Sequence, residues 1–357
     1  MTELLELGGW PALIGDLLDR NHLTAHQAKV AMRTVLAGDA TPAQLIGFVV
    51  ALRAKGETSE EISGLLDAVL EAATPVPLPG DVLDRAVDIV GTGGDRSHSI
   101  NVSTISAFVV AGAGVPVCKH GARAASSKCG AADLLEALGV VVELGPEGVA
   151  RSIQETGMGF CLAARYHPSF RFAAPARREV GVPTVFNLLG PMANPARVRR
   201  QVIGVANASF AERMVASLQT HGSVAAWVVA GQGLDELSTT GPSTVLALRD
   251  GEIDHVVVDA VEFDLPRAQP EDLVGGEPAD NAKAARSVLE GHRGPHRDIV
   301  LLNGAAALVV AGVVPDLGAG IVAAEQSIDS GRAAAVLDGL VRVSTEAAAA
   351  EADAAGS

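Results

Sequence analysis

The spacing of apolar residues divides the chain into a helical beginning and a longer region of alternating strands and helices. In residues 1–75, apolar side chains recur at helical spacing. The helices expected from this spacing are Trp10–Leu18, Ala25–Leu36 and Ile62–Ala72. Thr41 followed by Pro42 predicts a further helix start, because threonine caps a first turn and proline fits its first position. We therefore predict a small all-helical domain over residues 1–75.

The pattern changes after the proline-rich linker Thr74–Gly80. Short apolar runs then alternate with helical patterns, which predicts an α/β region with parallel strands. The expected strands are Asp88–Val90, Val115–Cys118, Val140–Val142, Val202–Val205, Ala225–Val229, Ser243–Leu248, His255–Val258 and Ile299–Asn303. The expected helices are Ile105–Ala113, Pro146–Thr156 and Ala211–Thr220.

These elements predict an α/β fold in which the small all-helical domain is joined to a large α/β domain with a mixed, partly parallel central sheet. We assign residues 76–163 and 183–345 to the α/β domain. A helical segment near 164–182 is expected to return to the first domain and form one wall of a cleft. Residues 346–357, EAAAAEADAAGS, are acidic and of low complexity, so we predict a disordered tail there.

Composition limits the partners and the compartment. The formal net charge of −15 argues against nucleic-acid binding, and any anionic ligand must be held by local cations, backbone amides or a metal. The cysteines have no metal-ligand spacing, which favours free thiols in a reducing cytoplasm. We see no signal peptide, and the apolar run Ile105–Val117 is too short to span a bilayer. We therefore expect a cytoplasmic protein without a membrane partner.

A glycine-rich loop follows the first predicted strand, and a second polar motif follows it. The loop GTGGD at 91–95 is not GxGxxG, which disfavours a dinucleotide site. Its free amides favour a phosphate instead. Asp95 either caps its own turn or accepts hydrogen bonds from a sugar hydroxyl. Likewise, NVST at 101–104 either caps the next helix or faces a phosphate or a magnesium ion.

The loop after the second predicted strand carries cations, hydroxyls and a glycine, in the run KHGARAASSK at 119–128. In so acidic a chain, this cluster favours an anion site over a solvated basic loop. The pair Asp235–Glu236 is either an acidic turn or a site for a hard cation such as Mg²⁺. The pair Arg177–Arg178 provides either solvated helix charges or bidentate recognition of a carboxylate.

Taken together, these motifs resemble those of the anthranilate phosphoribosyltransferase family. The matching runs are GTGGD at 91–95, NVST at 101–104, KHGxRxxSS at 119–127, RREVGVPTVFNLLGPMANP at 177–195 and DEL at 235–237. The resemblance implies the second step of tryptophan biosynthesis, in which the 5-phosphoribosyl group moves from 5-phosphoribosyl 1-diphosphate to the amino group of anthranilate. The products are N-(5-phosphoribosyl)anthranilate and diphosphate. The resemblance also implies two Mg²⁺ ions and a homodimer formed through the helical domain.

The resemblance further implies a role for individual residues. The phosphoribosyl diphosphate would contact Gly91, Gly94, Asp95, Ser99, Asn101, Val102, Ser103, Thr104, Lys119, His120, Gly121, Ala122, Arg123, Ala124, Ala125, Ser126, Ser127 and Ala131. The anthranilate would contact Gly91, His120, Ala122, His167 and Arg177. Magnesium would be held by Ser103, Asp235 and Glu236. No general base is evident, so Lys119 and Mg²⁺ would act by stabilising the leaving diphosphate.

Ala122 departs from the family pattern, which has asparagine at this position. Losing one hydrogen bond typically costs ~1 kcal/mol, and up to ~3 kcal/mol if its partner is left unpaired. The departure leaves two enzymatic alternatives open, transfer to anthranilate or to a different aromatic acid or amine. A non-catalytic binder and a pyrimidine nucleoside phosphorylase are the remaining alternatives. The acidic pair and Ser103 argue against the binder, because they retain the groups that magnesium chemistry needs.

Overall fold

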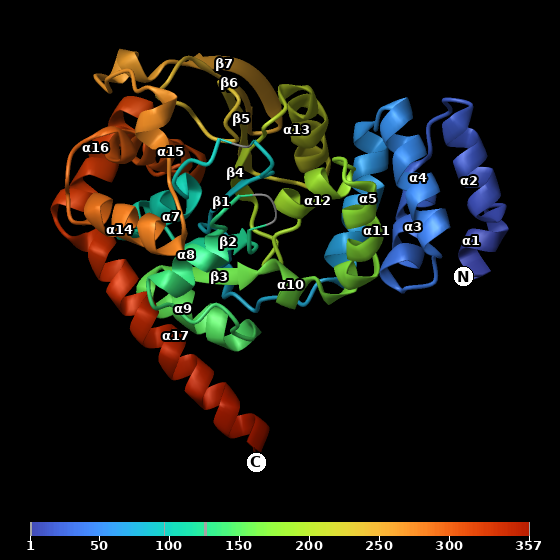
Figure 1. The fold of residues 1–357 in the computed structure, drawn as a ribbon, viewed down its shortest axis with the longest axis horizontal. Helices are drawn as coiled ribbons and strands as arrows, with labels where there is room; N and C mark the ends of the chain where they lie inside the picture. The colour runs from blue at the N-terminus through green and yellow to red at the C-terminus, as the bar shows by residue number, and fades with distance from the viewer. Residues whose placement is uncertain (1, 96, 125–126, 357) are drawn as a thin grey trace.

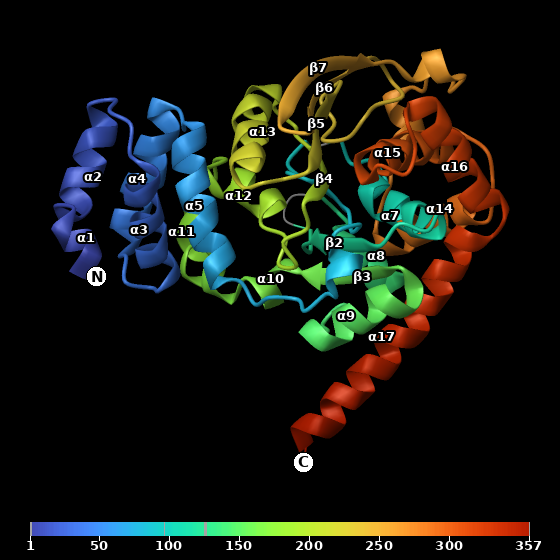
Figure 2. The ribbon, with the colours of Figure 1, turned by 180° about the vertical axis from the view of Figure 1, so that it is seen from behind.

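The computed structural model describes residues 2–95, 97–124 and 127–356 (Figure 1). A block of helices lies at one end of the molecule, and a larger α/β body occupies the rest. Figure 2 shows the same arrangement from behind, with α12 and α13 between the helical block and the central sheet. Among the described residues, no helix has both the length and the hydropathy that a bilayer crossing requires.

The helical block is built from the N-terminal helices, and the sequence predicted all but the first of them. They are α1 (Thr2–Glu6), α2 (Gly9–Leu18), α3 (Ala25–Leu36), α4 (Pro42–Lys55) and α5 (Ser59–Ala72). The helices α3, α4 and α5 each begin with a threonine capping box, which pairs threonine with glutamine or glutamate three residues later. The short segments η1 (Pro168–Phe172) and α11 (Ala174–Val180) pack on this block, and Ala173 and Ala176 share its apolar core.

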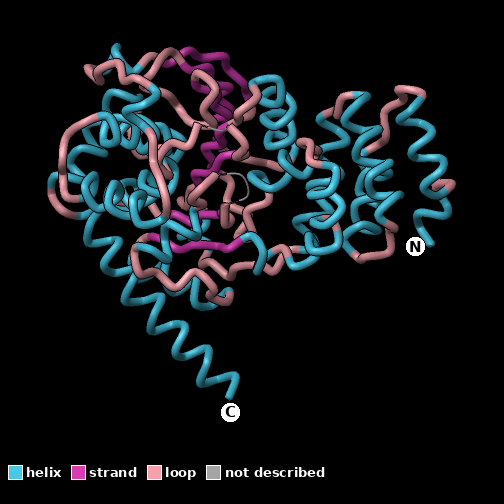
Figure 3. Tube along the Cα trace, viewed as in Figure 1, coloured by secondary structure: helices cyan, strands magenta, loops and turns pink. Residues whose placement is uncertain are grey.

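The central sheet of the α/β body is mixed, as predicted. Its strand order is β1 (Asp88–Gly91), β4 (Arg200–Gly204), β5 (Ala225–Gly231), β6 (Ser243–Arg249) and β7 (Glu252–Val258). The first three of these strands are parallel, and β6 and β7 are antiparallel additions. A parallel pair, β2 (Val117–Gly121) and β3 (Met158–Leu162), continues from β1 through a bridge between Val87 and Val117. Figure 3 shows the strands running through the middle of this body.

Helices cover both faces of the sheet. They are α6 (Gly80–Leu83), α7 (Val102–Gly112), α8 (Ala131–Ala137), α9 (Pro146–Thr156), α10 (Ala163–Tyr166), α12 (Phe186–Met192), α13 (Ala211–Thr220), α14 (Pro278–Leu289), α15 (Pro295–Ala311), α16 (Leu317–Asp329) and α17 (Arg332–Gly356). Short 3₁₀ turns occur at η2 (Ala208–Phe210), η3 (Ala260–Phe263) and η4 (Pro270–Leu273). Of the helices predicted here, α9 and α13 have the predicted bounds, and α7 overlaps its predicted range.

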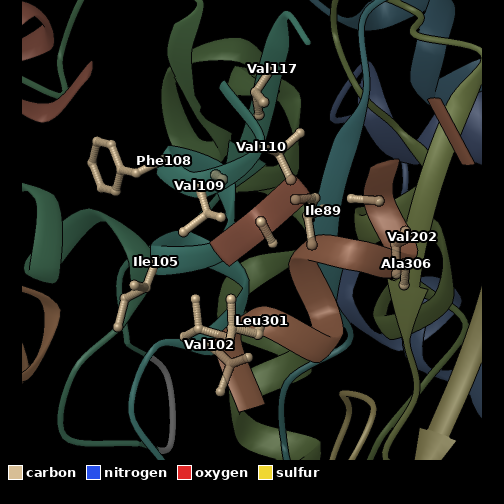
Figure 4. Close-up of a cluster of buried hydrophobic side chains, with 14 of the residues drawn as sticks. Ile89, Val102, Ile105, Phe108, Val109, Val110, Val117, Val202, Leu301 and Ala306 are labelled. Carbon is tan, nitrogen blue, oxygen red and sulfur yellow. The ribbon is translucent and has the colours of Figure 1, made fainter. Parts of the chain in front are cut away.

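Successive strand residues point to opposite faces, and each face has its own core. Ile89 and Val202 belong to the cluster that contains α7 and α15, which Figure 4 shows in close-up. Val90 and Ile203 belong to the cluster that contains the helical block and α13. The helical block therefore shares a core with one face of the sheet, which fixes its position relative to the ends of the strands.

Two strand predictions are wrong. Ile299–Asn303 lies inside α15, and Val140–Val142 is a loop between α8 and α9 with Val140 and Val142 buried. A short apolar run cannot distinguish a buried helix or a buried loop from a strand, because all three cover their side chains equally. The sequence reading missed β3, which pairs with β2.

The prediction of a disordered tail is also wrong. Helix α17 continues to Gly356, and Ser357 lies outside the described residues. Alanine is the strongest helix former, so the repeated alanines favour continuation of the helix. Glu346 pairs with Arg151 at 2.6 Å, and Glu351 accepts a hydrogen bond from the Gly145 amide at 2.9 Å. These contacts attach the last turns to the start of α9.

Candidate active site

A cavity of about 350 Å³ lies where β1 and β2 end and α7 begins. Because β1 and β2 run parallel and are bridged at Val87 and Val117, their carboxyl ends open at the same edge. Ligands in open α/β folds bind at this edge, beyond the carboxyl ends of the strands. The loop after β5 adds Asp235 and Glu236 to the same cavity.

Most of the predicted contact residues line this cavity. They are Gly91, Gly94, Asp95, Ser99, Asn101, Val102, Ser103, Lys119, His120, Gly121, Ala122, Arg123, Ala124, Ser127, Ala131, Asp235 and Glu236. Thr104 is buried and is not part of the lining, and neither are His167 and Arg177. Ala125 and Ser126 lie outside the described residues.

The glycine-rich loop and the acidic loop are fitted closely to each other. A Cβ atom at Gly91 would collide with the Asp235 carboxylate, and one at Gly204 would collide with the Asp235 carbonyl oxygen. The Gly93 amide donates to Asp235 Oδ2 at 2.6 Å. Glycine is therefore required at these strand ends because the acidic loop approaches the backbone directly.

In the acidic pair, Glu236 is buried and Asp235 is half-buried, and the two carboxylates are only partly neutralised. Burial and the nearby Asp95 raise the pKa of Asp235 to about 7. Burial and Asp235 raise the pKa of Glu236 well above its usual range, and the ammonium of Lys119 opposes this shift. Glu236 Oε1 accepts a hydrogen bond from the Ser103 amide at 3.2 Å. Among the described residues no three His, Cys, Asp or Glu side chains gather closely enough for a metal ion.

Lys119 is the buried cation of the cavity. Its side chain is 1% exposed, and Nζ donates to the Ile89 carbonyl at 2.5 Å and to Ser103 Oγ at 3.2 Å. Burial lowers the pKa of Lys119, while the charges of Asp88, Glu236 and Asp235 oppose that shift. The ammonium therefore lies between a main-chain acceptor on β1 and a side-chain acceptor at the start of α7, beside the acidic pair.

The start of α7 has polar groups without partners. Asn101 occupies the N-cap position but makes no side-chain capping bond, and its Nδ2 donates instead to the Cys129 carbonyl at 3.1 Å. Within the described part of the chain, Asn101 Oδ1 and Thr104 Oγ1 are buried without hydrogen-bond partners. The geometry thus does not support the capping interpretation for Asn101.

Two predicted residues are engaged with neighbouring protein groups. The Arg123 guanidinium donates to both carboxylate oxygens of Glu136, at 2.5 and 2.9 Å, and to Glu143 at 3.3 Å. Asp95 accepts a hydrogen bond from Ser97 Oγ at 2.7 Å, which is the turn-stabilising interaction. Arg123 is therefore paired with Glu136 and Glu143, whereas Lys119 on β2 keeps its ammonium beside the acidic pair of the cavity.

A row of rings leads away from His120. The His120 and His167 rings are 5.1 Å apart, His167 stacks on Phe170 at 5.2 Å, and Phe170 meets Phe186 edge-on at 5.6 Å. The Arg177 guanidinium lies over the Phe186 ring at 4.7 Å. We call this row of four rings and Arg177 the aromatic wall. It brings together three residues predicted to contact the acceptor, namely His120, His167 and Arg177. Within the wall, His120 alone is part of the cavity lining.

The aromatic wall is electrically neutral at its histidines. Burial lowers the pKa of His120 to about 3 and that of His167 to about 4. His167 Nε2 contacts the Ala193 carbonyl at 2.9 Å, whereas His120 Nε2 is buried without a partner among the described residues. Burial also lowers the pKa of Arg177. His120 therefore lines the cavity with a neutral ring that keeps one nitrogen without a hydrogen-bond partner in the part of the chain that the structure describes.

Asn187 and Asp88 are among the residues near the site that the sequence did not indicate. Asn187 lines the cavity from α12, with its Oδ1 accepting from the Thr184 amide at 3.1 Å. Its signal was its place inside the long motif at 177–195. Asp88 was read only as the start of an apolar strand, yet it is fully buried beneath Lys119 and His120. Nothing in the alternation of the sequence marks a buried carboxylate.

A helical bundle joined to an α/β body, with a polar cavity at the strand ends, defines a two-domain glycosyl transferase. The helical bundle domain of a glycosyl transferase family matches residues 11–73, and the α/β domain of such a family matches residues 83–334. The chain belongs to the anthranilate phosphoribosyltransferase family.

Relatives of known name and structure carry this assignment. The anthranilate phosphoribosyltransferase of Salinispora arenicola is 48% identical over 339 residues, covering 94% of this chain and 96% of the relative. The crystal structure of the Thermus thermophilus enzyme is 40% identical, with a TM-score of 0.88, and covers 93% of this chain and 99% of that one. The Saccharomyces cerevisiae enzyme in complex with PRPP and Mg is 28% identical, with a TM-score of 0.85, covering 94% and 98%.

Proposed function

We propose that this chain transfers the 5-phosphoribosyl group from 5-phosphoribosyl 1-diphosphate to the amino group of anthranilate. The observation that carries the proposal is the convergence of Lys119, Ser103 and the Asp235–Glu236 pair on one cavity that also meets the aromatic wall at His120. The same family assignment favours anthranilate over another aromatic acid or amine as the acceptor.

The donor set suits magnesium. Asp235 and Glu236 offer carboxylate oxygens whose pKa values are raised by burial and by neighbouring carboxylates, and Ser103 adds a hydroxyl. Hard oxygen ligands of this kind are those that Mg²⁺ prefers, together with substrate phosphates. We assign these three residues as the holders of two Mg²⁺ ions, which would neutralise the charge that develops on the leaving diphosphate.

The chain's own groups bind and orient the phosphoribosyl donor. Residues 91–95 and the first turn of α7 line the cavity, and the start of a helix favours a phosphate. Lys119 directs its ammonium to the same place and stabilises the departing diphosphate. The ribose carbon then gains positive character as its bond to the diphosphate oxygen breaks.

The aromatic wall suits the acceptor. A flat arylamine can meet this wall at His120, the ring that lines the cavity, and Arg177 at the other end of the wall offers a guanidinium for the carboxylate. The amine nitrogen forms the new bond to the ribose carbon as the bond to the diphosphate oxygen breaks, and the amine proton passes to the released diphosphate. The neutral His120 Nε2 is placed to accept a hydrogen bond from that amine. An arylamine is already a neutral nucleophile, so holding it close supplies much of the acceleration.

The assembly and the compartment are part of the same proposal. An apolar groove on the helical block, lined by Trp10, Ile14 and Leu18, leaves Leu18 69% exposed. This exposure supports a homodimer formed through the helical domain. The buried free cysteines support a reducing cytoplasm as the location.

The test is turnover with purified enzyme. When the enzyme is mixed with 5-phosphoribosyl 1-diphosphate, anthranilate and MgCl₂, the fluorescence of anthranilate should decrease, and one diphosphate should be released per product formed. EDTA should abolish the reaction and excess MgCl₂ should restore it. Turnover of a substituted arylamine with none of anthranilate would overturn the choice of acceptor, and phosphate-dependent nucleoside cleavage would overturn the whole assignment.

A further inference from the structure

Asp88 is a buried carboxylate that the proposed reaction does not use. It begins β1, has no exposed surface, and is not part of the cavity lining. Burial raises the pKa of Asp88 to about 6, while Lys119 and hydrogen bonds from Asn194 and His120 oppose the shift. Aspartate is almost never buried fully unless it is paired, so its partners indicate what it holds in place.

The first partner is the backbone of β2. Asp88 Oδ1 accepts a hydrogen bond from the His120 amide at 3.1 Å. One residue along β1, the Ile89 carbonyl accepts the Lys119 ammonium at 2.5 Å. The strand β1 therefore holds both members of the Lys119–His120 pair from beneath, one through a side chain and the other through its main chain.

The second partner is the loop that supports the aromatic wall. Asp88 Oδ2 accepts from Asn194 Nδ2 at 2.9 Å, and the same amide donates to the Cys118 carbonyl at 2.8 Å. The preceding residue, Ala193, places its carbonyl 2.9 Å from His167 Nε2. The Asp88 carboxylate is thus bonded on one side to the strand that carries the cation and on the other to the loop that orients His167.

We propose that Asp88 is a positioning residue for phosphoribosyl transfer, joining the diphosphate-binding strand to the acceptor-binding loop and placing a negative charge beneath the Lys119 ammonium. The inference rests on the proposed function. It predicts that loss of the Asp88 charge shifts Lys119 and His120 relative to each other. Misplacement of catalytic groups by about 1 Å can cost about 100-fold in rate.

The experiment compares Asp88→Asn with Glu61→Gln. Glu61 is also fully buried, accepts from the Leu23 amide at 2.9 Å and pairs with Lys55 at 2.9 Å, but it lies in the helical block. Per folded enzyme, Asp88→Asn should lower kcat about 10- to 100-fold and raise KM for the phosphoribosyl donor more than KM for anthranilate. Glu61→Gln should lower the melting temperature and leave all three constants unchanged.

A double variant tests whether Asp88 acts through Lys119. In a Lys119→Met background, Asp88→Asn should cause little further change in KM for the donor, because the group it positions is already gone. If Asp88→Asn does not fold, Asn194→Ala replaces it, since that change removes one of the bonds to Asp88 and should shift the same constants less.

The outcomes separate the inference from the function. Wild-type turnover combined with unchanged kcat and KM values in folded Asp88→Asn would overturn the inference and leave the proposed function intact. Additive effects of Asp88→Asn and Lys119→Met would likewise overturn the inference and leave the proposed function intact. Failure of the wild-type enzyme to turn over would instead overturn the proposed function.

Discussion

The two sides of the cavity carry different kinds of side chain. The side that we assign to the diphosphate carries charges, namely the buried Lys119 and Glu236 and the half-buried Asp235, on strand ends and loops. The aromatic wall is made of rings and neutral imidazoles, with Arg177 at its far end. The difference matches the substrates, since a departing diphosphate needs charge and a flat arylamine needs an apolar surface.

The two sides also differ in how they are supported. The charged side is fixed by the parallel strands and by the close approach of Asp235 to Gly91 and Gly204. The aromatic wall is carried mainly by residues 163–192, which pack against the helical block. The substrates should therefore respond differently to changes on the two sides, and the following experiments test that separation in order of decreasing effect.

The largest effect is expected from Lys119→Met. Removal of a preorganised charge that stabilises a transition state costs about 100- to 1,000-fold in kcat, and we expect a loss in that range. Steady-state kinetics with both substrates would measure it. Lys128→Met is the matched control, because Lys128 lies in the loop that follows β2 and its side chain is 63% exposed. Equal losses in the two variants would contradict a special role for the buried ammonium.

Arg177→Ala should act on the acceptor alone. A hydrogen bond to a charged group contributes about 1.5–3 kcal/mol, so KM for anthranilate should rise about 10- to 100-fold while KM for the phosphoribosyl donor stays nearly constant. The exposed neighbour Arg178 supplies the control variant Arg178→Ala. A rise in the donor KM of the same size would show that the two sides of the cavity are not separate.

The neutrality of the aromatic wall predicts a pH dependence of stability. The pKa values of His120 and His167 are lowered in the folded state to about 3 and about 4, so below pH 6.5 the unfolded chain binds protons that the folded chain does not. The contribution of the two histidines to stability should be fully present above pH 6.5 and should fall as the pH decreases toward 4, by about 1.4 kcal/mol per pH unit for each histidine. The raised pKa values of Asp88 and Asp235 act in the opposite direction over the same range.

Thermal unfolding of the ligand-free enzyme between pH 7.5 and pH 5 would give the slope of stability against pH, and comparison with variants would isolate the part due to His120. His120→Asn should reduce the slope, and His255→Asn, on an exposed position of β7, should leave it unchanged. An unaltered slope in His120→Asn would mean that this imidazole is not held neutral by burial.

The smallest effect is expected from Ala122→Asn, which restores the residue typical of the family. One additional hydrogen bond is worth ~1 kcal/mol, so KM for anthranilate should fall about fivefold, with little change in KM for the donor. Identical constants before and after the change would show that Ala122 is neutral for acceptor binding, and a lower donor KM would place residue 122 on the charged side.

Local sequence predicted most of the fold, because helical spacing and capping are local properties. The threonine capping boxes of α3, α4 and α5 and the bounds of α9 and α13 follow from neighbouring residues alone. The failures at Ile299–Asn303 and Val140–Val142 have one cause, which is that burial by distant elements hides the period of a short apolar run. The prediction of a disordered tail failed because the contacts that stabilise the end of α17 are made with α9 and with the residue before it.

For the site, the sequence determined the chemical groups and the tertiary structure determined their state. The motifs at 91–95, 101–104, 119–127 and 235–237 supply the amides, hydroxyls, cation and carboxylates, which are properties of residue types. Only the fold decided that Lys119 is buried beside Glu236, whereas Arg123 is neutralised by Glu136. The fold also placed the Asp88 carboxylate against the backbone of β2. Burial and charge pairing depend on residues distant in the chain, so no local pattern could specify them.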